Sequence, residues 1–178
     1  MDASPYLRTP FDRKSRSYPK WAFFITLLGG VNYQHTVEDV AELREQIGKL
    51  AEAVRAADLE ALKHLYAPDV VSFDVGPRIQ DVGADAKLNN WMAAFTLFQH
   101  PLGVEVRDIR ITVGGDVAFG HSFNRLSGTL KNGTKTRGFW VRATYCFRKI
   151  DGNWLIVHDH ASAPMDPESG KALLNLEP

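Results

Sequence analysis

Hydrophobic residues recur every three or four positions between residues 40 and 66, which is the spacing of one face of an amphipathic helix. These positions are Val40, Leu43, Ile47, Leu50, Val54, Leu59, Leu62, Leu65 and Tyr66. The pattern restarts at Ala57-Asp58, so we expect two consecutive helices that bend there and end near Pro68. Residues 36–39 are typical of a capping box, which satisfies free amides at a helix start, and this predicts that the domain begins at Thr36.

Shorter patterns follow along the middle of the chain. Residues 70–74 predict a short strand, which Gly76-Pro77 ends. Residues 81–98 predict a third helix, and its inner side would hold Leu88, Trp91, Met92 and Phe95. Apolar residues alternate with polar ones over residues 104–113, which predicts a further strand.

Two tight-turn signals divide the last third of the chain into three strands. Asn132-Gly133 separates residues 117–130 from 135–149, and Asp151-Gly152 separates the latter from residues 154–161. Such pairs favour β-hairpins because both central turn residues need a positive φ. Helices first and strands afterwards predict an α+β fold, with the helices on one face of an antiparallel sheet.

The pairing register of these strands predicts a ligand pocket. Two central residues in each turn would place Arg125 opposite Trp140, His121 opposite Thr144, and Thr144 opposite Asp159. One face then mixes aromatic and polar side chains: Phe119, His121, Phe123, Arg125, Trp140, Arg142, Thr144, Val157, Asp159 and Ala161. Polar groups are costly to bury unpaired, so we predict that this face lines a concave pocket with apolar walls.

The opposite face would carry Gly120, Ser122, Val141, Ala143, Tyr145, Phe147, Trp154, Ile156, His158, His160 and Ser162. Its small, aliphatic and aromatic character predicts packing against a second subunit, as a homodimer. A single-residue bulge in either hairpin would exchange the two faces downstream of it. The pair His158 and His160 also permits a metal site, but no further Cys or carboxylate cluster completes one, so an interface role is favoured.

Composition narrows the possible partners. Lys+Arg and Asp+Glu both number 21 in 178 residues, and a formal charge of zero argues against a nucleic-acid-binding surface. No segment approaches the ~20 apolar residues of a membrane span. Cys146 is the single cysteine, so an intrachain disulfide is impossible, and we expect a cytoplasmic protein. We expect neither a metal nor another cofactor.

Residues 1–35 differ from the rest of the chain. They hold three prolines and several basic residues before an apolar stretch at residues 21–28, a pattern that weakly resembles a targeting signal. We expect a disordered extension here, or a start codon assigned too early. The predicted organisation is this extension, a domain over residues 36–165 and a tail over residues 166–178.

Two stretches of the domain resemble known proteins. Residues 65–76 (LYAPDVVSFDVG), followed by a helix led by Gly83, resemble the first strand region of ketosteroid isomerases and polyketide cyclases, the SnoaL-like proteins. Residues 147–164 (FRKIDGNWLIVHDHASAP) resemble the closing hairpin of SnoaL-like domains and of the association domain of calcium/calmodulin-dependent kinases. The resemblance covers about residues 36–165. It implies the nuclear transport factor 2-like fold, a curved sheet wrapped around three N-terminal helices to form a cone with a deep pocket.

The resemblance implies a role for Asp74, which falls where ketosteroid isomerases keep the general base that moves a proton next to a carbonyl. The two oxyanion donors of that family, a tyrosine and a protonated aspartic acid, fall near Leu50 and Thr144. Losing both removes ~3 kcal/mol or more of stabilisation per donor, which counts against steroid isomerisation itself. Arg142 or His121 could supply a substitute donor.

Each candidate residue also has a structural interpretation. Asp74 could instead satisfy loop amides beside Gly76. His121 could be a core histidine bonded to Thr144 or Asp159, and Arg142 and Asp159 could form a buried ion pair. The catalytic candidates are Asp74, His121, Arg142 and Asp159, and the ligand-binding candidates are Trp91, Phe95, Phe123, Arg125, Trp140 and Thr144.

Two functions fit these candidates. The first is an isomerase or lyase that acts on a small hydrophobic ligand with a carbonyl or acid group. The second is a non-catalytic ligand-binding or oligomerisation module of the same fold, since fold does not determine function.

Overall fold

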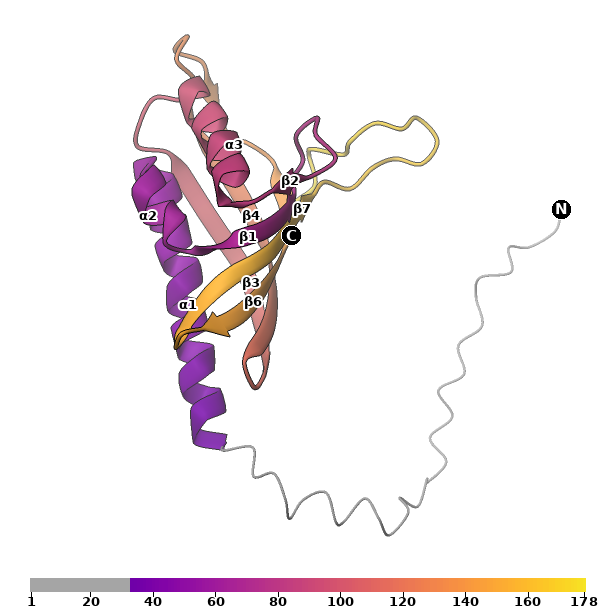
Figure 1. Cartoon of the computed structure of the whole chain (residues 1–178). Helices are drawn as coiled ribbons and strands as arrows, with labels where there is room; N and C mark the ends of the chain where they lie inside the picture. The colour runs from indigo at the N-terminus through magenta and orange to yellow at the C-terminus, as the bar shows by residue number, and fades with distance from the viewer. Residues whose placement is uncertain (1–32) are drawn as a thin grey trace, which may run out of the picture. The chain divides into compact units, whose positions relative to one another are not determined.

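The computed structural model describes residues 33–178. Two helices, α1 (Tyr33–Ala56) and α2 (Leu59–Lys63), open this part of the chain (Figure 1). The remaining elements follow in order: β1 (Tyr66–Phe73), β2 (Asp81–Val82), α3 (Ala84–Leu97), β3 (Gly103–Gly114), β4 (Val117–Thr129), β5 (Lys135–Thr136), β6 (Trp140–Ile150) and β7 (Asn153–Ser162). The predictions for residues 1–32 lie outside the described residues.

The predicted bend between the first two helices is confirmed. Ala57 has a φ of 55°, which breaks the helix, and the Asp58 carboxylate caps α2 by accepting a hydrogen bond from the Ala61 amide at 2.9 Å. The predicted cap at Thr36 is wrong. α1 already begins at Tyr33, and no proline or glycine stands in residues 33–35 to stop it.

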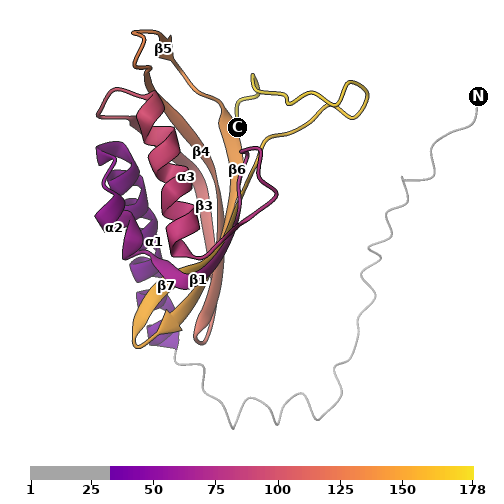
Figure 2. The same cartoon turned by 45° about the horizontal axis from the view of Figure 1, so that its top comes forward.

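The strands form one curved sheet, and all three helices lie against its concave face (Figures 1 and 2). The strand order is β2-β1-β7-β6-β4-β3, with β5 paired to β4. The predicted α+β cone is confirmed, but the sheet is mixed, because β1 and β7 run parallel. This pairing also ends the second helix early, since the Leu65 carbonyl accepts the Ile156 amide at 2.9 Å.

The predicted register holds between β4 and β6 and fails between β6 and β7. Arg125 pairs with Trp140 and His121 with Thr144, as expected. Beyond the two-residue turn at Asp151-Gly152, the register shifts next to Val157, which is the extra residue of a β-bulge. Thr144 therefore pairs with His160, and Asp159 pairs with Tyr145 on the opposite face.

The two predicted faces of the sheet are inverted on β4 and β6, whereas Asp159 and Ala161 of β7 turn toward the helices, on the side predicted to line the pocket. The face toward the helices is the one with small residues, and Ala118, Ser122 and Ala143 are buried there. The β4 and β6 residues predicted to line a pocket turn outward, and Phe119 is 51% exposed among them. Small residues let α1 and α3 approach the sheet closely, and bulky Phe, His and Arg side chains on that face would hold them away.

α3 contributes an unexpected residue to the interior. Met92, predicted on its inner side, is 47% exposed, whereas Lys87 is only 3% exposed. Lys87, Trp91 and Phe95 lie four residues apart and therefore share one face of the helix. Within residues 33–178, no helix combines the length and apolarity that a membrane span requires.

Candidate functional site

A cavity of about 800 Å³ opens between the helices and the concave face of the sheet. Most of its wall is apolar, including Ile47, Leu50, Val54, Trp91, Leu97, Phe98, Val104, Val106, Val141 and Ala143. Asp74, Lys87, Asn90 and Asp159 also line it and supply polar groups. A mostly apolar cavity with a few convergent polar groups is typical of a small-molecule site.

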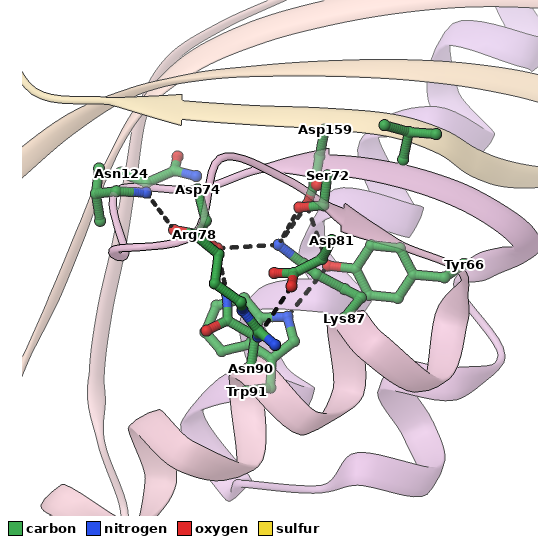
Figure 3. Close-up of polar contacts among 12 residues, drawn as sticks. Tyr66, Ser72, Asp74, Arg78, Asp81, Lys87, Asn90, Trp91, Asn124 and Asp159 are labelled. Carbon is green, nitrogen blue, oxygen red and sulfur yellow. Dashed lines mark hydrogen bonds and ion pairs between the residues drawn. The ribbon is translucent and has the colours of Figure 1, made fainter.

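Lys87 is the centre of the polar group (Figure 3). Its Nζ donates to Ser72 Oγ at 2.9 Å and to Asp74 Oδ2 at 3.2 Å, and it pairs with Asp159 Oδ2 at 2.9 Å. The Lys87 side chain is only 4% exposed. A buried ammonium is tolerated because charged and polar partners take up its three hydrogen-bond donors.

Asp74 stands at the end of β1 and is the more accessible of the two carboxylates. Its side chain is 26% exposed, against 11% for Asp159. Oδ2 accepts from Lys87 and from Asn90 Nδ2 at 3.1 Å, and Oδ1 accepts from the Val75 amide at 2.8 Å. The loop-amide role considered for Asp74 is therefore present together with a place in the cavity wall.

Asp159 enters the cavity from β7 because of the bulge at Val157. Its Oδ2 contacts Lys87 and accepts from Tyr66 Oη at 3.4 Å, and Trp91 Nε1 donates to the same hydroxyl at 3.2 Å. Within the described residues, Asp159 Oδ1 is buried without a hydrogen-bond partner. A buried carboxylate oxygen left this way is costly, and a ligand donor would satisfy it.

The pKa values of two groups in the site, Lys87 and Tyr66, are raised. Burial disfavours the ammonium, but the charges of Asp159 and Asp74 and their hydrogen bonds outweigh this effect and raise the pKa of Lys87. Burial, reinforced by Asp159, also raises the pKa of Tyr66 well above its usual value. At neutral pH, Lys87 is therefore a cation and Tyr66 a neutral donor.

A second polar group lies on the sheet wall of the same cavity. Ser122 Oγ donates to Asn124 Oδ1 at 2.8 Å, and Asn124 Nδ2 donates to Tyr145 Oη at 2.5 Å. Burial raises the pKa of Tyr145 to about 12. Asn124 and Tyr145 line the cavity, so they offer hydrogen bonds on the sheet side.

The structure brings three of the predicted residues together, namely Asp74, Asp159 and Trp91. Arg125 lies at the cavity edge, where its guanidinium pairs with Glu105. Phe95 is buried and stacks on Trp91 at 5.7 Å between ring centroids, behind the cavity wall.

The other predicted residues lie on the outer face of the sheet, outside the cavity lining: His121, Phe123, Trp140, Arg142 and Thr144. His121 is exposed, so it is not a core histidine. Arg142 is exposed and donates to the Ala163 carbonyl at 3.4 Å, so it does not pair with Asp159. The predicted ion pair of Asp159 exists, but its cation is Lys87.

Sequence reasoning missed Lys87, Tyr66, Ser72, Asn90, Asn124 and Tyr145. A signal for Lys87 was available, because it precedes Trp91 by one helical turn and so interrupts the apolar stripe of its helix. A charged residue on such a stripe needs a buried partner, and Asp74 was a candidate. Among residues 33–178, no three His, Cys, Asp or Glu residues are grouped to hold a metal ion.

Comparison with known proteins shows which family the chain belongs to. A nuclear transport factor 2-like protein of unknown function from Pseudomonas putida KT2440 is 31% identical, with a TM-score of 0.70, over 78% of this chain and 95% of that one. A protein provisionally described as a dehydratase of the same superfamily, from Streptomyces avermitilis, is 20% identical, with a TM-score of 0.63, over 72% of this chain and 98% of that one. This second likeness shows the fold alone.

A third structure comes from Xanthomonas campestris and is provisionally described as a calcium/calmodulin-dependent protein kinase II association domain. It is 25% identical, with a TM-score of 0.59, over 73% of this chain and 87% of that one. No curated protein matches the chain. The SnoaL-like domain model matches residues 43–166. The chain therefore belongs to the SnoaL-like domain family, within the nuclear transport factor 2-like superfamily.

Proposed function

We propose that the protein is a small-molecule enzyme, an isomerase or lyase that moves a proton next to the carbonyl of a hydrophobic ligand. One observation carries the proposal: the Asp74 carboxylate lines an apolar cavity of about 800 Å³ beside the buried ammonium of Lys87. The apolar wall would take the hydrocarbon part of the ligand out of water. The polar group at Lys87 would then receive the carbonyl end.

In this mechanism Asp74 is the general base. It takes a proton from the carbon next to the carbonyl, and the bonding electrons move onto the carbonyl oxygen to form an enolate. Asp74 then returns the proton to another carbon, which gives an isomer. In the lyase version, a β-hydroxyl group leaves instead, and the proton from Asp74 completes a water molecule.

Lys87 supplies the positive charge that the enolate needs. The two positions that carry oxyanion donors in ketosteroid isomerases are unsuitable here, because Leu50 is apolar and Thr144 faces outward. A fixed cation acts strongly at short range in a cavity of low dielectric. Asp159 and Ser72 would act as positioning residues, since they hold the Lys87 ammonium in place.

A second function, ligand binding without catalysis, is favoured by one feature of the same site. Ser72, Asp74 and Asp159 already engage Lys87 Nζ, so a ligand oxygen must displace one of them to bond the ammonium directly. A protein that binds its ligand without a chemical reaction does not need a ligand oxygen to displace one of these partners.

We also infer a homodimer formed through the outer face of the sheet. Phe73 is 41% and Phe119 is 51% exposed on this face. The His158 and His160 rings contact Phe73 edge-on, at centroid distances of 4.9 and 6.0 Å. Exposed aromatic side chains in one patch are typical of interaction surfaces. We keep the cytoplasm as the proposed location, because Cys146 is a free thiol.

The proposed reaction is tested by hydrogen exchange. Native mass spectrometry of the purified protein first identifies a co-purifying ligand, and a panel of hydrophobic ketones supplies further probes. Exchange of the hydrogens next to the carbonyl is then followed in D₂O for the wild type, Asp74→Asn and the exposed control Asp69→Asn. We expect Asp74→Asn to slow exchange by about 100-fold or more, with ligand affinity kept and the control unchanged.

Two results would reject the enzyme. If Asp74→Asn exchanges as fast as the wild type, Asp74 is not the base. If the wild type binds ketones without exchanging their hydrogens, the cavity belongs to a binding module.

A further inference from the structure

A cluster of charged and aromatic side chains lies on the outer face of the sheet, where Arg125 also reaches the edge of the cavity. The Trp140 indole is only 6% exposed there. The guanidinium groups of Arg107 and Arg125 lie 4.4 and 4.7 Å from its ring centre. Glu105 pairs with both arginines. Stacking on an indole and pairing with a carboxylate hold each guanidinium in one orientation.

One side chain from the far end of the chain occupies this cluster. Glu177 Oε2 accepts from Trp140 Nε1 at 2.8 Å. Its other oxygen, Oε1, lies 3.5 Å from Arg125 Nη1 and 3.8 Å from Arg137 Nη2. The two carboxylate oxygens thus have different partners, an indole N–H on one side and two guanidinium groups on the other. Such a two-sided arrangement is the geometry of carboxylate recognition.

The cluster around Trp140 is held together without the tail. Trp140, Arg125, Arg107 and Glu105 all belong to strands of the sheet, and their mutual contacts do not involve Glu177. The hydrogen bond from Arg125 and that from Arg107 lower the pKa of Glu105, so this internal partner stays ionised. Three arginines and one glutamate leave a net charge of 3 − 1 = +2 around Trp140 before Glu177 is counted.

The tail, by contrast, makes few contacts with the sheet, and its backbone hydrogen bonds at Leu173 and Lys171 join it to Pro164 and Asp166, just beyond β7. Leu173, Leu174 and Leu176 are 41%, 44% and 51% exposed, so they bury little apolar surface. Within the described residues, the polar contacts that join residues 167–178 to the sheet are those of Glu177. A preorganised receptor with a weakly attached occupant can exchange that occupant for another of the same chemistry.

We propose that Trp140, Arg125 and Arg137 form a carboxylate-binding site on the outer face of the sheet, and that Glu177 of the tail is its exchangeable internal ligand. The external ligands would be free carboxylic acids, or an acidic segment such as the tail of a second copy. A flexible tether presents its end group at an effective concentration on the order of 1 mM. External carboxylates therefore compete poorly until Glu177 is removed or displaced.

The site lies next to the cavity along the chain. Arg137 contacts Glu177, and the residues that follow it, Gly138 and Phe139, line the cavity. Gly138 has a φ of 64°, and a side chain there would collide with the Leu126 carbonyl. The backbone of this segment therefore lies close against β4.

The test uses the full chain and the indole N–H signals of its four tryptophans in ¹⁵N NMR, with Trp140→Phe identifying one of them. Glu177→Gln is compared with the wild type and with Glu168→Gln, an exposed tail control. The probes are sodium acetate and a synthetic peptide of residues 171–178, each matched with sodium chloride at equal ionic strength. In Glu177→Gln, we expect a saturable shift of the Trp140 signal with a midpoint of about 0.1 mM or below, well under the ~1 mM effective concentration of the tethered Glu177.

The wild type and Glu168→Gln should show no such shift at these concentrations, because Glu177 occupies the site. Adding Arg137→Gln to Glu177→Gln should weaken binding several-fold. A shift with acetate identifies free carboxylates as ligands, and a shift with the peptide alone restricts the ligand to a tail-like segment. The proposal is overturned if neither probe moves the Trp140 signal, or if all four indole signals move together.

Discussion

The two faces of this sheet differ in how they hold ionisable side chains, which are buried and paired on the inner face and exposed to water at several positions on the outer face. On the inner face, Asp159 is buried, and it shares the Lys87 ammonium with Asp74 and Ser72. On the outer face, His121 and Arg142 are exposed, and water solvates them. The same types of side chain can therefore be costly on one face and nearly neutral on the other, depending on what covers the strand.

This difference shows how the fold makes a site. The inner face places small residues under the helices, and the space left between them forms the cavity. A few polar groups in that space must bond one another, which fixes their orientation. On the outer face, the C-terminal tail covers Trp140 through Glu177, whereas His121 and Arg142 stay exposed.

The largest expected effect comes from removing the inner cation. Lys87→Met should destabilise the protein by about 3–5 kcal/mol, because it leaves two carboxylates facing each other without their shared partner. Urea unfolding measures the loss. Lys49→Met is the matched control: Lys49 is 56% exposed and pairs with Glu45 on the helix surface, so its loss should cost at most about 1 kcal/mol.

A rescue experiment separates charge from packing at the same position. Adding Asp159→Asn to Lys87→Met removes one of the stranded charges, so part of the lost stability should return. If Lys87→Met costs less than about 1 kcal/mol, the inner ion pairs do not differ from those at the surface, and the contrast between the faces fails.

A smaller effect should appear at alkaline pH. In the unfolded chain a tyrosine ionises near pH 10, whereas burial raises the pKa of Tyr145 to about 12. The stabilising contribution of neutral Tyr145 is thus complete below about pH 10 and is lost as the pH rises toward about 12. The raised pKa values of Tyr66 and Lys87 act in the same direction.

Unfolding free energies measured from about pH 9 upward test this expectation. As the pH rises through this range, the free energy of unfolding of Tyr145→Phe should fall by about 2–3 kcal/mol less than that of the wild type. This difference is the free-energy equivalent of two pKa units. Identical curves for the two proteins would mean that Tyr145 is not buried as a neutral group on the inner face.

The smallest effect on stability is expected on the outer face. Phe119→Glu places a charge in a patch that is already exposed, so unfolding of the monomer should change by about 0.5 kcal/mol or less. Dimer formation should nevertheless weaken by tenfold or more, since a charge would oppose itself across a two-fold interface. Sedimentation over a range of concentrations measures the proportions of monomer and dimer. A dimer that is unaffected by Phe119→Glu must use another surface.

Much of the fold was predictable because local chemistry determines it. The turn at Asp151-Gly152 and the bend at Asp58 follow from short-range preferences. The pairing of Arg125 with Trp140 was predicted from a two-residue turn at Asn132-Gly133, but Thr129 pairs with Lys135, so that turn is one residue longer and the register is restored between β5 and β6. Asp74 also entered the candidate site from the sequence, through its resemblance to a family position and its place at a strand end.

Two outcomes required the tertiary structure. Strand periodicity states which residues share a face, but it cannot state which face the helices cover, and the extra residue at Val157 exchanges the faces within one strand. Lys87 became part of the site because β1 and β7 pair side by side, which brings Asp74 and Asp159 to one ammonium from positions far apart in the chain. The sequence by itself determined most of the elements and their order, but it predicted helix where β2 lies and one strand where β5 and β6 are separate. Only the packing of helices on the sheet decided which charges are buried, because burial depends on contacts between segments distant in sequence.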